Sequence, residues 1–285
     1  MNLRLYITLL SFLMVYSLSA QQKTPYRLYN ADGKKKSYRK LLKEAKKADV
    51  VLFGELHNNA IAHWLQYELA VDLHRKESLI LGFEMLERDN QEVLEQYLRG
   101  EIDQKQLDSM ARLWHNYKTD YKPLVDFGKD KGLSVFASNI PRRYASMIFH
   151  GGFEALDSLP DAEKVWMAPL PIDYDPTLPG YDQMTEMMGG HNGENLPKAQ
   201  AIKDATMAYF INKYWRKNHV LLHCNGAYHS KDYEGINWYL NRYNPDLKIL
   251  TITTETVEDV KKFDKDLKHK ADFIILVDEN MTNTY

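Results

Sequence analysis

A run of four apolar residues, Val50–Phe53, constrains the fold most, because the chain changes character abruptly where the run ends. Four consecutive apolar side chains are typical of a buried strand. Gly54, Glu55 and His57 follow directly. A buried parallel strand that ends in a carboxylate and an imidazole delivers those groups to the carboxyl edge of its sheet, where open α/β sheets bind ligands.

The same arrangement recurs three times along the chain. Apolar strands are predicted at residues 79–83, 133–137 and 219–222, and polar side chains follow each of them: Glu84, then Asn139 with Arg143 and Tyr144, then His223 with His229. Two more strands are predicted at 247–252 and 273–277. Helical patterns separate the strands, so we expect an α/β fold with a mainly parallel sheet flanked by helices. Parallel strands end on the same side of a sheet, so these polar groups are expected to surround one crevice.

Two helices are predicted next to these strands. The helix at 59–76 carries His63 and Gln66, which either reach the crevice or only make local capping contacts. The helix at 197–217 places Asp204 on an otherwise apolar stripe. A carboxylate in that position needs a partner, and we expect Arg143 or His229 to provide it.

The length of 285 residues fits one α/β domain over residues 21–285 with an insertion. Residues 157–197 hold six of the ten prolines and a cluster of methionines around Met184. A long helical segment broken by proline and rich in methionine is typical of a lid or binding subregion, or of a surface excursion with its own small apolar cluster.

Residues 1–20 are typical of a secretory signal peptide. Arg4 gives a basic start, an apolar run covers residues 5–15, and small residues occupy 17–20. The run is short for a membrane-spanning helix, although an uncleaved anchor is the alternative. The sole cysteine, Cys224, is far from this segment, so neither a lipid anchor nor an internal disulfide is expected. We predict export to a bacterial periplasm or outer-membrane surface.

The charge balance argues against polyanionic partners. The formal net charge is −2, and charged residues make up 27% of the chain. No global field therefore favours nucleic acid or an anionic membrane. We expect no nucleic-acid partner.

The strand-end residues allow two kinds of chemistry. Glu55, His57, Glu84 and His229 can bind a divalent metal or perform acid–base catalysis in a hydrolase. Their spacing does not match the helical zinc motif H-E-x-x-H. Cys224, beside His223, is either a thiol nucleophile or, more commonly, a small buried apolar residue.

The alternative to metal binding or acid–base catalysis is haem binding. Tyrosine and histidine, both present near the strand ends, are side chains that ligate haem iron. Arg142 and Arg143 can pair with propionates. The methionines and aromatic residues of the insertion suit a flat apolar macrocycle.

The motifs resemble one known family. Gly54-Glu55-Leu56-His57, followed by His63 and Gln66, is similar to the ChaN-like haem-binding proteins of the Tiki/erythromycin-esterase-like superfamily. Further matches occur at residues 84–91, 139–145, 200–208 and 226–236. Gly54-x-x-His57 and Gly226-x-x-His229 resemble the paired Gly-x-x-His signatures of that superfamily. The resemblance covers roughly residues 40–255.

The resemblance implies a haem site near the sheet edge, between the two subunits of a homodimer. It implies Tyr144 as an iron ligand, with His57, His63 and His229 as alternatives, and a role in bacterial iron acquisition with an outer-membrane haem transporter as partner. The superfamily also contains metal-dependent hydrolases whose Glu and His residues occupy the same strand ends. The alternative function is therefore a hydrolase that uses Glu55, His57, Glu84 and His229.

Overall fold

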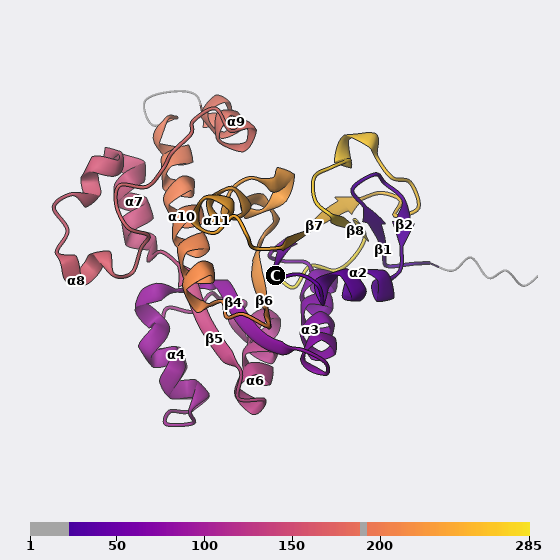
Figure 1. The fold of residues 1–285 in the computed structure, drawn as a ribbon, viewed down its shortest axis with the longest axis horizontal. Helices are drawn as coiled ribbons and strands as arrows, with labels where there is room; N and C mark the ends of the chain where they lie inside the picture. Colours follow the sequence, from indigo (N-terminus) through magenta and orange to yellow (C-terminus); the bar gives the residue numbers. More distant parts are fainter. Residues whose placement is uncertain (1–22, 189–192) are drawn as a thin grey trace, which may run out of the picture.

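The computed structural model describes residues 23–188 and 193–285 (Figure 1). Within them lies one eight-stranded sheet in the order β2-β1-β8-β7-β3-β6-β4-β5. The strands are β1 (Tyr26–Asn30), β2 (Lys35–Lys36), β3 (Val50–Glu55), β4 (Ser78–Glu87), β5 (Ser134–Asn139), β6 (His219–Gly226), β7 (Ile249–Val257) and β8 (Phe273–Asp278). The strands from β8 to β5 pair in parallel, whereas β1 pairs antiparallel with β2 and β8. The predicted α/β class with a mainly parallel sheet is confirmed.

Helices connect the parallel strands. They are α2 (Tyr38–Ala45), α3 (Ala60–His74), α4 (Gln91–Leu98), α5 (Gln104–Met110), α6 (Lys122–Asp130), α7 (Arg142–Gly151), α8 (Asp161–Lys164), α9 (Pro179–Met188), α10 (Asn195–Tyr214) and α11 (Ile236–Tyr243). Two shorter turns are important for the site: the π-helical turn η3 (Tyr117–Tyr121) and the 3-10 turn η5 (Ala227–His229).

Several boundaries differ from the prediction. β4 and β6 continue to Glu87 and Gly226, so Glu84 lies within its strand rather than after it. Residues 101–117 do not form one continuous helix, because α5 ends at Met110. Strands β1 and β2 were not predicted, since residues 21–48 are mostly polar. They are held at the edge of the sheet by pairing, β1 with β8 and β2 with β1.

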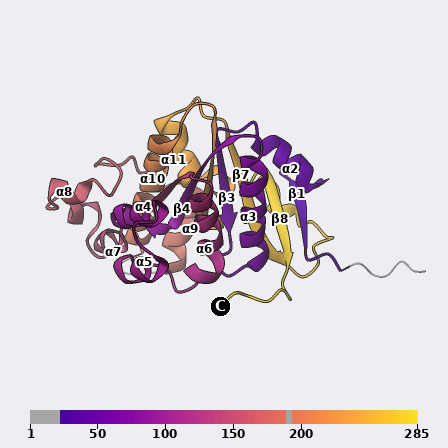
Figure 2. The ribbon, with the colours of Figure 1, turned by 90° about the horizontal axis from the view of Figure 1, so that it is seen from below.

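The side chains of the central strand β3 alternate between the two faces of the sheet. Val51 and Phe53 pack in a cluster with α3 and α6, and Val50 and Leu52 pack in a second cluster with α10 and α11. Figure 2 shows the strands between these helices. Burial on both faces explains why β3 has a continuous apolar sequence.

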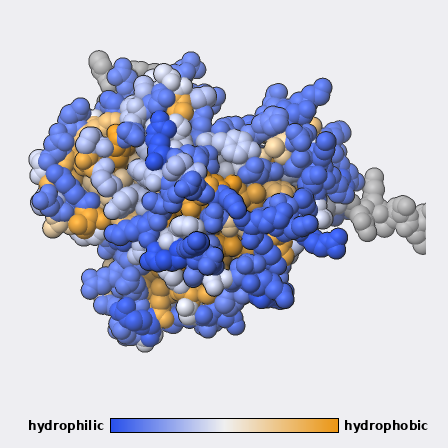
Figure 3. Space-filling view, in the orientation of Figure 1, coloured by the Kyte–Doolittle hydropathy of each residue, from blue (hydrophilic) through white to orange (hydrophobic). Residues whose placement is uncertain are grey.

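A helical subdomain lies at the opposite end of the molecule from β1 and β2. It contains α7 and α8 (Figures 1 and 2). Its core combines Ile148 of α7, Ile202 of α10, and Leu156 and Met167 from the segment between these helices. Figure 3 shows hydrophobic surface over this region, where Met147, Phe149, Phe153, Leu159 and Trp166 are only partly buried.

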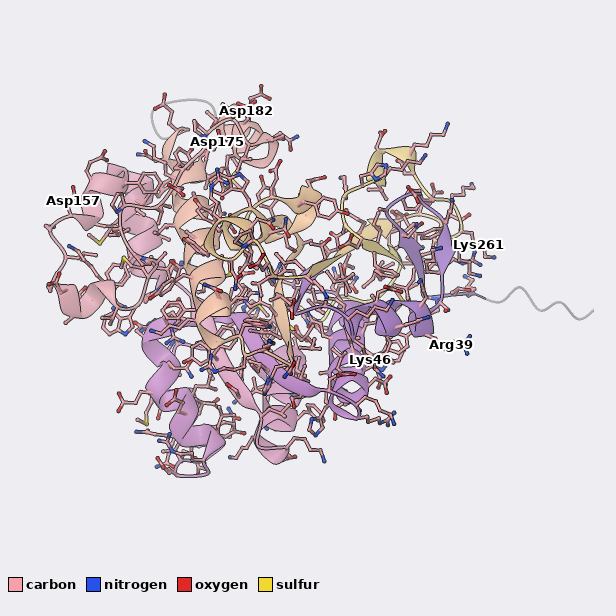
Figure 4. The ribbon with its side chains drawn as sticks, viewed as in Figure 1. Arg39, Lys46, Asp157, Asp175, Asp182 and Lys261 are labelled. Carbon is pink, nitrogen blue, oxygen red and sulfur yellow. The ribbon has the colours of Figure 1, made fainter. Side chains whose placement is uncertain are left out.

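Figure 4 locates several charged side chains at the two ends of the molecule. In Figure 4, Asp157, Asp175 and Asp182 lie toward α8 and α9, whereas Arg39, Lys46 and Lys261 lie toward α2 and β1. The predicted signal peptide, residues 1–20, lies outside the described residues. Among the helices of residues 23–188 and 193–285, none has the length and apolar character needed to cross a membrane.

Candidate functional site

A cavity of about 680 Å³ lies at the carboxyl ends of β3, β4, β5 and β6. Cofactor and small-molecule sites commonly occupy roughly 300–1,000 Å³. The cavity wall brings together Glu55, His57, Glu84 and His229. Asn139 at the end of β5 also lines the wall, so residues from four strand ends share one pocket, as the parallel topology requires.

His57 presents one ring nitrogen to the cavity. Glu55 is 1% exposed, and its Oε1 lies 2.9 Å from Nδ1 of His57. The same carboxylate accepts hydrogen bonds from the Tyr121 hydroxyl at 2.7 Å and from Nε2 of Gln66 at 2.6 Å. These bonds fix the carboxylate, which in turn orients the imidazole. Within the described residues, no hydrogen bond engages Nε2 of His57, so this atom can serve as a ligand or a base.

The pKa of His57 is set by burial and by the neighbouring carboxylates. Burial lowers the pKa of His57, but the hydrogen bond to Glu55 and the charges of Glu84 and Glu55 outweigh burial and raise it above its ordinary value of 6.5. The ring is also held edge-on to Trp114, with centroids 4.9 Å apart.

His229 is held between two carboxylates. Its Nδ1 lies 2.6 Å from Oδ1 of Asp204, and its Nε2 lies 3.2 Å from Oε1 of Glu84. Burial lowers the pKa of His229, but the charges of Glu84 and Asp204 outweigh burial and raise it to about 10. At neutral pH the ring is therefore an imidazolium that donates from both nitrogens and has no free lone pair.

Glu84 completes this ion cluster. Its Oε2 accepts a hydrogen bond from the backbone N–H of Gly226 at 2.6 Å. Burial raises the pKa of Glu84, but the positive charge of His229 outweighs burial and holds the pKa far below its ordinary value of 4.5. The Asp204 carboxylate also accepts a hydrogen bond from the Tyr181 hydroxyl at 2.7 Å. The expected partner of Asp204 is thus His229, and not Arg143.

Two glycines allow the strand ends to approach one another. A Cβ on Gly226 would lie 2.8 Å from Nε2 of His57. A Cβ on Gly54 would lie 2.8 Å from the carbonyl oxygen of Ile252 and 2.9 Å from Cα of Ala227. Side chains at these positions would therefore displace either the imidazole or the backbone that carries it.

Three predicted ligand-binding residues do not line the cavity. Tyr144 is 1% exposed, and its hydroxyl donates a hydrogen bond to Glu163. Arg143 pairs with Asp89 at 2.5 Å and donates to the Tyr144 hydroxyl at 2.9 Å. His63 is buried and donates from Nε2 to the carbonyl oxygen of His57 at 3.0 Å. Their roles in haem binding stay predictions, and each would need to leave these partners to reach a ligand in the cavity.

Arg142 does line the cavity, together with residues that the sequence reasoning did not identify as site residues. These are Trp114, Gln200, Lys203, Tyr228 and Tyr285, among others. Tyr228 lies inside the Gly226-x-x-His229 signature, which could have drawn attention to it. Trp114 and Tyr285 come from a loop and from the end of the sequence, and no local pattern marks them. The insertion at 157–197 contributes no described residue to the cavity wall.

Two residues of the wall carry a buried acceptor that has no hydrogen-bond partner among the described residues: Oδ1 of Asn139 and Oε1 of Gln200. A buried acceptor that stays unpaired costs roughly 1–3 kcal/mol.

The described residues contain no group of three or more His, Cys, Asp or Glu side chains arranged to hold a metal ion. Glu84 and His229 neutralise each other instead of facing a shared ion. Cys224 is fully buried in the core, and burial raises the pKa of its thiol well above the ordinary value. It is therefore a small buried apolar residue, and the thiol-nucleophile interpretation is wrong.

Comparisons with known proteins place this geometry in context. The family model described as haem-binding uptake, Tiki superfamily, ChaN matches residues 41–240. The solved structure of ChaN from Campylobacter jejuni, described by its cofacial haem binding, has a TM-score of 0.67 and 20% identity, covering 90% of this chain and 98% of that one. A Bacillus cereus structure has a TM-score of 0.51 and 10% identity, covering 84% and 90%.

An erythromycin esterase in its open conformation has a TM-score of 0.48 and 10% identity, covering 82% of this chain and 77% of that one. A search of curated proteins found no match. At these identities the two structures with TM-scores above 0.5 show a shared fold and no more, and the family match is the evidence that bears on haem.

Proposed function

Because this chain belongs to the ChaN family of haem-binding uptake proteins in the Tiki superfamily, we propose that it is an exported haem-binding protein of bacterial iron acquisition. The observation that carries the proposal is the composition of the cavity wall. One cavity combines an imidazole with a free Nε2, unpaired cationic side chains and partly exposed aromatic rings. Haem presents the matching groups: an iron, two carboxylates and a flat apolar ring.

The cationic part of the wall fits the propionates. Arg142 of α7 and Lys203 of α10 line the cavity, and neither makes an ion pair with a described residue. Charge-assisted hydrogen bonds from such groups to carboxylates are among the stronger polar contacts in proteins. We assign the propionates to Arg142 and Lys203, because Arg143 is already paired with Asp89.

The iron ligand is assigned to a histidine or a tyrosine at the carboxyl edge of the sheet, as both types ligate haem iron. His57 and Tyr228 line the cavity, and Tyr228 is 38% exposed. Burial, with the charges of Asp204 and Glu234, raises the pKa of Tyr228 to about 12. His229 is the weaker candidate, because both of its nitrogens face carboxylates. Tyr144 is the weaker tyrosine, because it does not line the cavity. Both hydroxyls already donate a hydrogen bond, that of Tyr144 to Glu163 and that of Tyr228 to the carbonyl oxygen of Gly180, so either tyrosine would have to give up this bond to ligate iron.

A haem titration of residues 21–285, followed by visible absorbance, tests the proposal. We expect a shifted Soret band at saturation. His57→Ala or Tyr228→Phe is expected to change the spectrum of the bound haem, whereas Tyr209→Phe, on α10 outside the cavity wall, is the matched control. Tyr144→Phe and His229→Gln test the two weaker candidates in the same assay. Absence of any spectral change in both oxidation states would refute haem binding.

Ligation by His57 or Tyr228 competes with a proton. The pKa values of both side chains are raised, so protonation opposes binding at neutral pH. We expect haem affinity to rise as the pH increases from about 6 to about 9. An affinity that falls over this range would argue against both ligands.

The family relationship also supports a homodimer that holds haem between two subunits, and delivery to or from an outer-membrane haem transporter. Sedimentation velocity with and without haem tests the homodimer, and we expect the dimer fraction to rise with haem.

Export is tested by N-terminal sequencing of the protein recovered from a periplasmic extract, where cleavage after residue 20 is expected. Recovery of the uncleaved chain from the cytoplasm would contradict it.

A hydrolase is the second candidate, favoured by one specific observation. The Glu55–His57 pair has the arrangement of a general base oriented by a carboxylate. Peptidase and esterase screens, with and without added divalent metal, discriminate between a hydrolase and a haem-binding protein. Activity that is lost in Glu55→Gln and His229→Ala, and that is insensitive to haem, would favour the hydrolase.

A further inference from the structure

The last five residues, 281–285, form an ordered segment at the edge of the cavity, here called the C-terminal strap. Tyr285 lines the cavity. The backbone N–H of Thr284 donates to the carbonyl oxygen of Asn58 at 3.0 Å, and Asn283 forms a β-bridge with Asn59. The Thr284 hydroxyl donates to Oδ2 of Asp120 at 2.8 Å. The strap is therefore held by both backbone and side-chain bonds.

The groups that hold the strap also hold His57. Asp120 and Asn116 are buried, and Nδ2 of Asn116 donates to Oδ2 of Asp120 at 2.7 Å. The same amide group donates to the carbonyl oxygen of His57 at 3.2 Å. One buried polar network thus joins the strap, through Thr284, to the backbone of the residue whose imidazole lines the cavity.

The strap leaves its aromatic ring open. Tyr285 is 53% exposed, although it lines the cavity. Its ring meets the ring of His115 edge-on, with centroids 4.3 Å apart. The neighbouring Trp114 also lines the cavity and meets the His57 ring edge-on. Tyr285 thus keeps about half of its surface uncovered while it lines a ligand-sized cavity, beside a second aromatic residue of the same wall.

The strap lies outside the region that the family model matches, which ends at residue 240. We propose that the C-terminal strap is part of the ligand site and that the ring of Tyr285 contacts the flat apolar face of bound haem. Thr284 is the positioning residue that holds the strap through Asp120. The inference rests on the proposed haem binding and adds a contact that the shared motifs do not contain.

Tyr285 is tested by the dissociation constant of haem in the full chain. We expect Tyr285→Ala to weaken haem binding about ten-fold, through loss of aromatic contact. Tyr285→Phe, which keeps the ring, should recover most of that affinity. Trp64→Ala is the matched control, because Trp64 is 48% exposed, packs against Tyr26 and does not line the cavity.

Thr284 is tested by paired substitutions and a second readout. Thr284→Val removes the hydroxyl that donates a hydrogen bond to Asp120 and should weaken haem binding several-fold. Thr284→Ser keeps the hydroxyl and should retain the wild-type affinity. Hydrogen exchange of the strap amides, measured without and with haem, should slow on binding. Thermal unfolding of each variant without haem shows whether the fold is intact.

The outcomes separate the two proposals. If the wild-type chain binds no haem, the proposed function fails and the strap inference falls with it. If the wild-type chain binds haem and folded Tyr285→Ala binds equally well, the strap inference alone is overturned. If Tyr285→Phe is as weak as Tyr285→Ala, the hydroxyl makes the contact, and the ring-contact assignment is wrong.

Discussion

At the scale of single residues, the site is built from opposed charges removed from water. Glu84, Asp204 and His229 are each at least nine-tenths buried. Their mutual attraction, together with the N–H of Gly226 and the hydroxyl of Tyr181, offsets the desolvation of the charges. The cluster fixes the backbone of η5, which places Tyr228 at the cavity.

We predict that His229→Gln lowers the free energy of unfolding by about 3–5 kcal/mol, because it leaves two buried carboxylates without a cation. Urea unfolding at pH 7 measures this value. His219→Gln, at the other end of β6, is the control and should change stability by less than about 0.5 kcal/mol. A loss below 1 kcal/mol in His229→Gln would contradict the buried ion cluster.

The same cluster predicts the pH dependence of stability. The pKa of His229 is raised from 6.5 to about 10, so its contribution is fully present below pH 6.5 and is lost as the pH rises toward 10. The pKa of Glu84 is lowered, so its contribution is present above pH 4.5 and is lost as the pH falls below that value. Unfolding curves measured across this range should show a maximum between the two limits. Stability that increases from pH 7 to pH 10 would be inconsistent with a protonated His229.

Gly226 tests the close approach of the strand ends. In Gly226→Ala the new Cβ would lie 2.8 Å from Nε2 of His57 and 3.6 Å from Oε2 of Glu84. The imidazole must then move, and we expect haem affinity to fall roughly ten-fold, equivalent to about 1.4 kcal/mol. The control is Gly151→Ala in α7, where the new Cβ meets only Cβ of Ala155 at 3.2 Å. Unchanged affinity in Gly226→Ala would exclude His57 as a haem contact.

At the scale of elements, the first turn of α9 is attached to the site by three hydrogen bonds. Tyr228 donates to the carbonyl oxygen of Gly180 at 2.6 Å, and the N–H of Gly180 donates to Glu234 at 2.8 Å. The Tyr181 hydroxyl donates to Asp204. The insertion therefore contacts the site through polar groups, of which the Tyr181–Asp204 pair is buried, although its methionines were expected to suit the ligand.

We predict that Tyr181→Phe loosens α9. The substitution removes a hydrogen bond to a charged carboxylate, which is worth about 1.5–3 kcal/mol. Hydrogen exchange of the amides in the first turn of α9 should become faster, and the free energy of unfolding should fall by a similar amount. Tyr209→Phe on α10 serves as the reference for loss of a phenol hydroxyl. Exchange equal to that of the wild type would show that the bond does not hold the helix.

At the scale of the whole molecule, the cavity joins elements that are distant in sequence. Its walls come from four strands, from α7 and α10, from the loop before η3 and from the C-terminal strap. A ligand that contacts all of them binds only the folded chain, so its binding energy adds to the stability of the fold.

Haem at 100-fold its dissociation constant should therefore raise the free energy of unfolding by about 2.7 kcal/mol. Calorimetry of the chain with increasing haem measures the shift in Tm. A haem analogue without propionates should give a smaller shift, because it cannot pair with Arg142 and Lys203. Equal shifts for both compounds would contradict the assigned propionate contacts.

The amino-acid sequence alone determined the parallel core and the location of the site. Apolar runs such as Val50–Phe53 are buried on both faces of the sheet, and the polar residues that follow them had to collect at one edge. Local patterning carries this information, because strand burial and strand direction follow from runs of a few residues and from the helices between them.

Tertiary structure alone decided which of those polar residues face the cavity. Tyr144 and Arg143 follow β5 as His229 follows β6, yet they turn toward Glu163 and Asp89, while Trp114, Lys203 and Tyr285 arrive from distant segments. The direction of a side chain and its pairing depend on neighbours that are far away along the chain. The same holds for His229, whose charge depends on Glu84 and Asp204, residues that only folding brings within hydrogen-bonding distance.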